Sequence, residues 1–314
     1  MRPGRGRLDI PSKLFGLSIR HESRAGPSRP GTLRLHLRNV PFIDLPRNST
    51  PLSQPGTSQT IRWTRSRTTH RVYWGDRLSV QVGPGQAVRV DSVATAEPFL
   101  AEALNVALAL YLSRRGFAVL HGGAIAVRRA VAVVMGPPGA GKSSLVLAMA
   151  RRGHEAVSDE IVPLEERHGI VRCPGGNPWI KVSPRHLLPL ERSSAYSTRE
   201  SEVLLDLRTI GLRAAREIRR IGCFFFLESR FGDGALPYRF EGIPPEDSLV
   251  RSLESAYTRR VLTDRQQSRQ FRVLAEAVRA VPSYRLAVRE GLENLNATAQ
   301  EIETLVSGTV PSTD

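Results

Sequence analysis

The residues with the clearest capacity for chemistry lie in the stretch Gly136-Pro-Pro-Gly-Ala-Gly141-Lys142-Ser143. It meets the pattern G-x-x-x-x-G-K-[ST] in full, between an apolar run at 131–135 and a helix expected over 143–152. In such a loop the glycines let successive backbone N–H groups and the helix N-terminus face phosphate oxygens. The lysine then reaches the β and γ phosphates, and the serine hydroxyl binds Mg²⁺. The alternative, a glycine-rich turn without a ligand, fits this context poorly. We therefore predict a phosphate-binding (Walker A) loop made of Gly136, Gly139, Ala140, Gly141, Lys142, Ser143 and Ser144.

Two acidic positions could serve that loop. Asp159 and Glu160 follow a short apolar stretch just after the expected helix, and adjacent carboxylates near a nucleotide suit Mg²⁺ coordination and proton acceptance. The same pair would also suit an acidic turn or a helix N-cap. Glu228 competes for the metal role, because it follows the apolar run 223–227 as a Walker B acid would. Spacing leaves both assignments open.

Three further features have a functional and a structural interpretation. His121 ends the apolar run that begins at Phe117, and a single histidine on a strand is more often structural than catalytic. The segment 175–179 (Gly-Gly-Asn-Pro-Trp) suits a substrate loop or an ordinary surface turn equally well. The basic run Arg213–Arg220 is interpreted as the solvated face of a helix rather than a binding patch.

The elements that must position these residues begin near residue 70. Residues 71–74 and 78–82 predict a β-hairpin around Gly75-Asp76, and 86–91 could add a third strand. Helical spacing of apolar residues predicts a helix over 97–113, followed by strands over 117–127 and 130–135. Downstream we expect a buried strand over 221–227, mostly helix over 246–281, and a last strand over 284–288.

Residues 1–68 are expected to form a basic arm of low order that contributes little to stability. Eight of the 22 prolines fall in residues 1–60. One piece has strand character, because Leu33, Leu35 and Leu37 alternate with polar residues. Residues 1–70 also hold 13 Arg and Lys against three acids, so the net charge of +15 belongs mainly to this arm. We therefore expect no nucleic-acid partner for the folded body.

Composition also indicates a compartment. No run of about 18 apolar residues is present, and no apolar segment follows the basic start, which argues against a membrane span or a secretory signal. Cys173 and Cys223 are too few for a disulfide framework or a zinc site. We expect a cytoplasmic protein without a membrane partner, and we leave a homo-oligomer open.

Together these residues resemble the catalytic domain of the HPr kinase/phosphorylase family. The match runs from Val119-Leu120-His121-Gly122, through the glycine-rich loop, to Arg152-Gly153-His154-Glu155-Ala156-Val157-Ser158-Asp159-Glu160. In that family a histidine-glycine strand precedes the P-loop, and an arginine-glycine-histidine turn leads to paired acids. Order and spacing agree over about forty residues. The second acid here is glutamate where the family usually has aspartate, the family's later glycine-rich signature is missing, and the chain before residue 117 does not match.

The resemblance implies an α/β P-loop fold of the HPr kinase/phosphoenolpyruvate carboxykinase type, here with a small N-terminal β-rich region. It implies Mg²⁺-dependent transfer of the γ-phosphoryl of ATP to a serine hydroxyl, with another protein or a precursor peptide as acceptor. Lys142 and Asp159 would be catalytic, with Asp159 as the general base and His121 orienting it. Ser143 and Glu160 would hold the metal. We expect a domain over 69–305 and a tail over 306–314, and we keep two alternatives, a nucleotide-dependent regulatory ATPase and a small-metabolite kinase.

Overall fold

The computed structural model describes residues 13–14, 17–21, 32–39, 43, 46, 48–52, 61–66, 69–83, 87–92, 100–192, 195–199, 202–228, 236–257, 261–289 and 291–309. The expected third-strand start at residue 86, the helix start at 97–99 and the last tail residues lie outside these ranges. No helix of the described residues is long and apolar enough to cross a bilayer.

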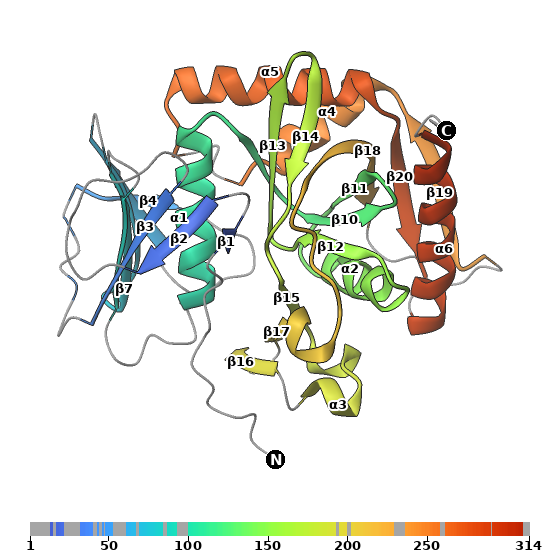
Figure 1. Ribbon diagram of the computed structural model, residues 1–314. Coiled ribbons are helices and arrows are strands. Elements are labelled where there is room, and N and C mark those ends of the chain that lie inside the picture. The colour runs from blue at the N-terminus through green and yellow to red at the C-terminus, as the bar shows by residue number, and fades with distance from the viewer. Residues whose placement is uncertain are drawn as a thin grey trace.

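The described elements form a mixed α/β protein in which strands dominate (Figure 1). The α-helices are α1 (Leu100–Arg114), α2 (Lys142–Arg151), α3 (Pro189–Arg192), α4 (Pro245–Glu254), α5 (Asp264–Ala280) and α6 (Leu292–Thr309). The strands of the N-terminal part are β1 (Lys13–Leu14), β2 (Leu17–His21), β3 (Thr32–Asn39), β4 (Thr50–Leu52), β5 (Ile61–Arg65), β6 (His70–Trp74), β7 (Leu78–Val82) and β8 (Ala87–Ser92). The later strands are β9 (Ala118–His121), β10 (Gly123–Val127), β11 (Ala130–Met135), β12 (Glu155–Ser158), β13 (Ile161–Arg167), β14 (Ile170–Pro174), β15 (Trp179–Val182), β16 (Ala195–Arg199), β17 (Glu202–Asp206), β18 (Ile218–Leu227), β19 (Tyr238–Ile243) and β20 (Ser283–Val288).

The first eight strands form one sheet in the order β1-β2-β3-β8-β7-β6-β5-β4, and α1 packs against it. The expected strand over Leu33–Leu37 is present as β3, which pairs in parallel with β8, and the hairpin β6–β7 is present as well. Leu35 and Ile61 are 3% and 2% exposed and belong to the same core as α1. The described residues within 1–68 therefore contribute strands and buried side chains, where composition had suggested an arm of low order. Strand pairing satisfies the backbone despite the prolines, which lie outside β3 and β5.

The division expected at residue 68 is crossed by this sheet, because β5 ends at Arg65 and pairs along its length with β6, which begins at His70. Arg65 also donates from Nη1 to the Leu262 carbonyl (3.0 Å), a contact to the C-terminal half of the chain. We call this N-terminal sheet the N-terminal module. Its strands come from both sides of the boundary expected at residue 68, and Arg65 connects it to the C-terminal half of the chain.

The second sheet is built around three parallel strands, with β18 lying between β11 and β20. The remaining strands extend it in the order β12-β10-β11-β18-β14-β13-β9, and β19 pairs with β20. Helices α2 and α6 cover one face, and α5 covers the other (Figure 1). Because the sheet is covered on both faces, its central strands are continuous apolar runs, as residues 221–227 predicted.

A small third sheet, in the order β15-β17-β16, lies beside α2 and shares its core (Figure 1). Helices α1, α2, α4 and α5 and strand β20 match the expected helices and last strand within a few residues. The basic run Arg213–Arg220 was wrongly expected to be helical. There Ala214 forms a bridge with Ala156, and β18 begins at Ile218, so the run enters the sheet.

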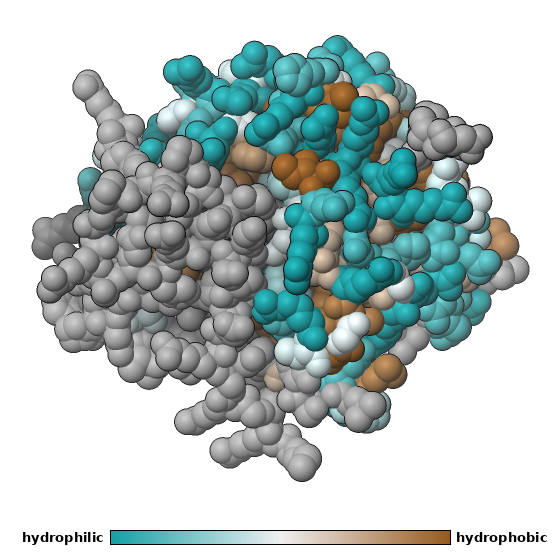
Figure 2. All heavy atoms as spheres, in the orientation of Figure 1, coloured by the Kyte–Doolittle hydropathy of each residue, from teal (hydrophilic) through white to brown (hydrophobic). Residues whose placement is uncertain are grey.

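The described part of the surface in Figure 2 is mostly hydrophilic, with hydrophobic side chains in small separate groups. The exposed large hydrophobic side chains lie on different elements, as is normal for a protein surface. They are Leu188, Ile218, Leu236, Val250 and Phe271.

The N-terminal module tests whether the early strands belong to the core. Leu35→Ala and Ile61→Ala should each lower the free energy of unfolding by about 2–4 kcal/mol, because each removes a buried side chain from the core shared with α1. Urea unfolding followed by circular dichroism measures this loss. Leu188→Ala, at an exposed position, is the control and should change stability by less than about 0.5 kcal/mol. Equal, small effects for all three variants would return residues 1–68 to an arm without a structural role.

Candidate functional site

The glycine-rich loop connects β11 to α2 at the carboxyl end of the parallel strands. Gly139 and Gly141 have φ of +78° and +101°, which only glycine adopts at low cost, and Gly141 caps α2 in the left-handed region. At Gly136 a Cβ atom would lie 2.6 Å from the Leu227 carbonyl oxygen, so glycine lets the loop pass close to the end of β18. The expected strand–loop–helix order and its backbone requirements are therefore present.

The side chains of the loop converge at the first turn of α2. The Lys142 ammonium folds back and donates to the carbonyls of Gly136 (2.9 Å) and Pro137 (3.1 Å). Burial lowers the pKa of Lys142, and the charges of Glu160 and Asp159 oppose that shift. Ser143 Oγ donates to Asp159 Oδ1 (3.0 Å), and Ser144 Oγ contacts His186 Nδ1 (2.8 Å). The carbonyls that hold Lys142 are replaceable partners, since an anion in the loop would attract the same ammonium.

Asp159 and Glu160 form the tight connection between β12 and β13. Glu160 has φ of +72°, an uncommon value for a residue with a side chain, and such strain gathers at functional sites. The backbone on either side is fixed, since Ile161 N donates to the Asp159 carbonyl (3.0 Å) and Asn177 Nδ2 to the same oxygen (3.3 Å). This geometry turns the two neighbouring carboxylates in different directions, Asp159 toward Ser143 and Glu160 toward Lys181.

The two acids differ in charge because they differ in partners. Asp159 is 2% exposed, and burial followed by the Glu160 charge raises its pKa to about 7. Hydrogen bonds from Lys181 N (2.9 Å) and Ser143 partly offset that shift. Burial also acts to raise the pKa of Glu160, but Lys181, then His121 and Lys142, hold it below its ordinary value. Glu160 is therefore the more acidic carboxyl of the pair, and Asp159 is the carboxyl whose ionisation burial opposes.

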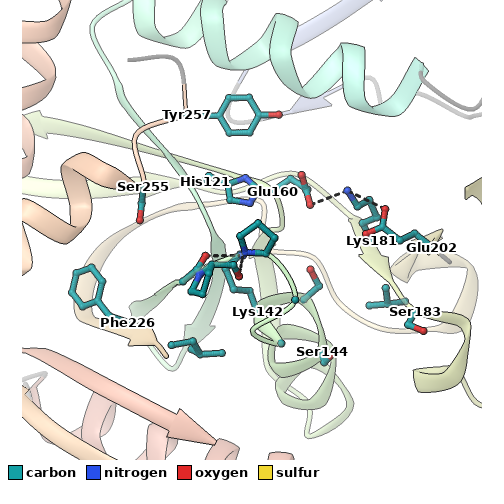
Figure 3. Close-up of a pocket in the computed structure, with 18 of the residues that line it drawn as sticks. His121, Lys142, Ser144, Glu160, Lys181, Ser183, Glu202, Phe226, Ser255 and Tyr257 are labelled. Atoms are coloured by element: carbon teal, nitrogen blue, oxygen red, sulfur yellow. Dashed lines mark hydrogen bonds and ion pairs between the residues drawn. The ribbon is translucent and has the colours of Figure 1, made fainter. Parts of the chain in front are cut away.

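His121 ends β9 and lies next to Glu160, with Tyr257 above it in the view of Figure 3. Its ring centroid is 5.6 Å from that of Tyr257. Burial lowers the pKa of His121, and the Glu160 charge opposes the shift. The charged groups that act on His121 are Glu160, Lys142 and Lys181. His121 therefore lies near Glu160, the second acid of the pair.

The other candidates from the sequence, Glu228 and the segment 175–179, have structural roles. Glu228 Oε1 lies 3.2 Å from Arg285 Nε and 3.8 Å from Arg251 Nη2, so its carboxylate forms ion pairs with two arginines. In the segment 175–179, Asn177 and Trp179 are 3% and 4% exposed, so it is neither a surface turn nor an open loop. Asn177 instead links Asp159 to the start of β15, because its Oδ1 accepts from Trp179 N (3.1 Å).

Lys181 on β15 is a member of the site that sequence reasoning missed. Its Nζ lies 3.4 Å from Glu160 Oε1 and 3.4 Å from Glu202 Oε2 (Figure 3). The motif search could not place it, because its proximity depends on where β15 crosses the acid turn.

These residues surround a cleft of about 820 Å³, large enough for a nucleotide. Of the predicted site residues, Ala140 (7% exposed) and Asp159 lie beneath its surface. The others line the cleft: His121, Gly136, Gly139, Gly141, Lys142, Ser143, Ser144 and Glu160. The described residues contain no cluster of three or more His, Cys, Asp or Glu side chains suited to a metal. Mg²⁺ needs less from the protein, since it is bound through one or two carboxylates together with phosphates and water. The Ser143 hydroxyl and the Asp159 carboxylate are oxygen donors of this kind.

The fold and site define a mixed α/β protein with a glycine-rich strand–loop–helix unit opening into a polar cleft with paired acids. No protein-family model matches the sequence, and no curated protein matches it. Among solved structures, the chain is similar to the Hpr(Ser) kinase/phosphatase from Coxiella burnetii. That similarity covers 60% of this chain and 94% of that chain, at 16% sequence identity and a TM-score of 0.32, the level of a distant structural neighbour.

The buried acid should affect stability in a pH-dependent way. A carboxyl whose pKa is higher in the folded than in the unfolded state favours folding while protonated, and that contribution is lost as pH rises through about 7. Without added Mg²⁺ or nucleotide, Asp159→Asn should therefore stabilise the protein at pH 8 by about 1–3 kcal/mol, and the gain should shrink toward pH 5. Urea unfolding at both pH values measures it. Glu217→Gln, on the exposed surface, is the control. A pH-independent or destabilising effect of Asp159→Asn would contradict this prediction.

Proposed function

We propose that this protein is a Mg²⁺- and ATP-dependent phosphotransferase that phosphorylates a serine hydroxyl of a protein or peptide. The observation that supports it most is the Ser143–Asp159 hydrogen bond at the first turn of α2, beside Lys142. Phosphoryl transfer needs a phosphate cradle, a cation on the terminal phosphates and an oxygen-lined metal position, and all three would meet there.

In this proposal the loop backbone and the N-terminus of α2 bind the phosphates, and Lys142 leaves the Gly136 and Pro137 carbonyls to contact the β and γ phosphates. Bound Mg²⁺ would neutralise phosphate charge. A carboxylate of the acid pair accepts the proton of the acceptor hydroxyl. The hydroxyl oxygen forms a bond to the γ-phosphorus, while the bond from that phosphorus to the β,γ-bridging oxygen breaks. ADP leaves with the bridging oxygen.

The contacts favour a division of labour between the acids that differs from the one the resemblance implies. Both carboxylate oxygens of Asp159 are engaged, one by the Ser143 hydroxyl and one by Lys181 N, and the residue is 2% exposed. Glu160 lines the cleft, and its side chain is 19% exposed. We therefore propose that Asp159 and Ser143 bind the metal and that Glu160 accepts the proton of the acceptor hydroxyl. The reverse assignment of the two acids is the competing one. His121, beside Glu160, would then orient the base.

The alternative of a regulatory ATPase depends on Glu228 as a water-orienting acid. Its carboxylate is held by Arg251 and Arg285, which supports a structural role for it and favours the kinase. A small-metabolite kinase differs from a protein kinase only in its acceptor. The decisive experiment incubates the protein with Mg²⁺ and γ-labelled ATP, with either the proteins encoded beside its gene or a panel of hydroxylated metabolites. Mass spectrometry then locates the label. Label on serine supports the proposal, label on a metabolite moves the acceptor, and label in free phosphate alone favours the ATPase.

Lys142→Ala tests the nucleotide assignment. The variant should fold, since the hydrogen-bond partners of the ammonium among the described residues are two loop carbonyls, but it should lose transfer by about 10³-fold, because a phosphate contact is missing in the transition state. Thermal melting checks the fold, and labelled ATP measures the rate. Lys13→Ala, on the edge strand β1, is the control lysine. Activity of Lys142→Ala within threefold of the parent would overturn the assignment.

Asp159→Asn and Glu160→Gln separate the two acid assignments. If Asp159 serves the metal and Glu160 the base, Asp159→Asn should raise the Mg²⁺ concentration needed for half-maximal ATP binding by about 10-fold. Glu160→Gln should leave that concentration unchanged and lower transfer by about 10² to 10⁴-fold. Calorimetric titration and turnover measure both quantities. The reverse pattern would restore Asp159 as the base, with Glu160 serving the metal.

A further inference from the structure

The basic residues of this chain are almost all arginine. The sequence contains 42 arginines and three lysines, and two of those lysines, Lys142 and Lys181, line the same cleft. Lysine offers a compact, movable ammonium, whereas arginine offers a rigid planar fork. In an arginine-rich chain, a lysine inside a cleft therefore marks a place where a point charge suits the chemistry. Lys142 has such a role in the proposed function, and Lys181 has none assigned.

The backbone and the ammonium of Lys181 have different partners. The backbone N–H donates to Asp159 Oδ2 (2.9 Å), which fixes β15 against the acid turn. The ammonium lies 3.4 Å from one carboxylate oxygen of Glu160 and 3.4 Å from one of Glu202. Glu202 stands on β17, two positions from Leu204, the cross-strand partner of Lys181. The 28% exposed side chain thus faces the cleft from a fixed backbone, and its partners are Glu160 of the acid pair and Glu202, which also lines the cleft.

The other basic side chains that line the cleft make contacts away from the paired acids. Arg251 lies 3.8 Å from Glu228 and over the Phe226 ring at 5.9 Å. The His186 ring contacts Ser144, and Arg185 lines the cleft with an exposed side chain. Lys181, in contrast, lies close enough to Lys142 for its charge to lower the pKa of that ammonium. The two lysines therefore act on the same space.

We propose that Lys181 is a second phosphate-binding cation, which contacts the terminal phosphate of bound ATP while Lys142 contacts the β and γ phosphates. The assignment rests on the proposed function and extends it. Charge on the oxygens of the transferred phosphoryl group calls for more than one cation, and kinases and GTPases supply an additional one near that group. In the unliganded protein, Glu160 and Glu202 neutralise the Lys181 ammonium. When nucleotide and metal enter, the ammonium turns from Glu160 to a terminal phosphate oxygen, and Glu202 remains its partner.

If Lys181 contacts the terminal phosphate, its loss should weaken binding of a nucleoside triphosphate more than binding of a diphosphate. A lysine with a purely structural role would not produce this difference. Lys181→Met should weaken binding of the non-hydrolysable ATP analogue AMP-PNP by about 10- to 100-fold in the presence of Mg²⁺, because a charged contact is lost. The same variant should bind ADP within about twofold of the parent, since ADP lacks the terminal phosphate. Isothermal titration with both nucleotides measures the ratio of the two dissociation constants. Unchanged ADP binding also shows that the variant is folded.

Two variants control for charge and for structure. Lys181→Arg keeps the positive charge and should restore at least half of the lost AMP-PNP preference on a logarithmic scale. Glu202→Gln removes one partner of the ammonium without removing the ammonium, and should leave the preference for AMP-PNP unchanged or increase it. If Lys181→Met does not fold, Lys181→Gln takes its place with the same expectation.

The failures are distinguishable. A parent protein that binds neither nucleotide overturns the proposed function and this inference with it. A parent that binds both, together with a Lys181→Met variant that loses neither or loses both equally, overturns only the role of Lys181. It would then be a residue that fixes the position of Glu160.

Discussion

The hydrogen bond between Ser143 and Asp159 is the contact on which the rest of the site depends. It joins the first turn of α2 to the turn between β12 and β13, and β10 contacts both α2 and β12. Their close approach requires a small residue on β10. A Cβ atom at Gly123 would lie 2.5 Å from Val146 of α2 and 3.7 Å from Asp159 Oδ1. A side chain at this position would displace the helix, and with it the glycine-rich loop, from the acid.

Burial at this contact also decides the electrostatics of the cleft. Two adjacent carboxylates cannot both be ionised at low cost in a desolvated site, so the one with the better cationic partner keeps its charge. The Lys181 ammonium is the cationic partner of Glu160, whereas Asp159 accepts a hydrogen bond from the Lys181 backbone N–H. The asymmetry is therefore a result of backbone geometry, since the left-handed Glu160 turns its side chain away from that of its neighbour. A strained turn is retained because it separates two acids that a regular strand would leave competing for one environment.

The local parts of this site could be predicted from the sequence, and the parts that depend on distant pairing could not. Gly136–Ser143 and the strand and helix around it are specified within about twenty residues, where spacing alone determines which groups converge. Asn177 and Lys181 reach Asp159 because β15 follows a buried segment back across the acid turn. Glu228 followed the Walker B pattern in sequence, yet Arg285 on β20 and Arg251 on α4 engage it. The place of the early strands in the core was missed for a related reason, because the alternation at Leu33–Leu37 predicts a strand but does not show that β3 pairs with β8, 53 residues away.

That pairing gives the N-terminal module a place in the site. Trp74 on β6 donates from Nε1 to Glu102 Oε1 (3.2 Å), and Glu102, in the first turn of α1, lines the cleft. The core of the module also includes Val119 of β9 and Ile161 of β13, the strands that end at His121 and begin after Glu160. Displacement of the module would therefore act on His121 and Glu160 through two buried side chains and not through a flexible linker. The N-terminal sheet therefore shares a core, through α1, with the strands that flank the paired acids and His121, and this packing helps to hold those residues in position.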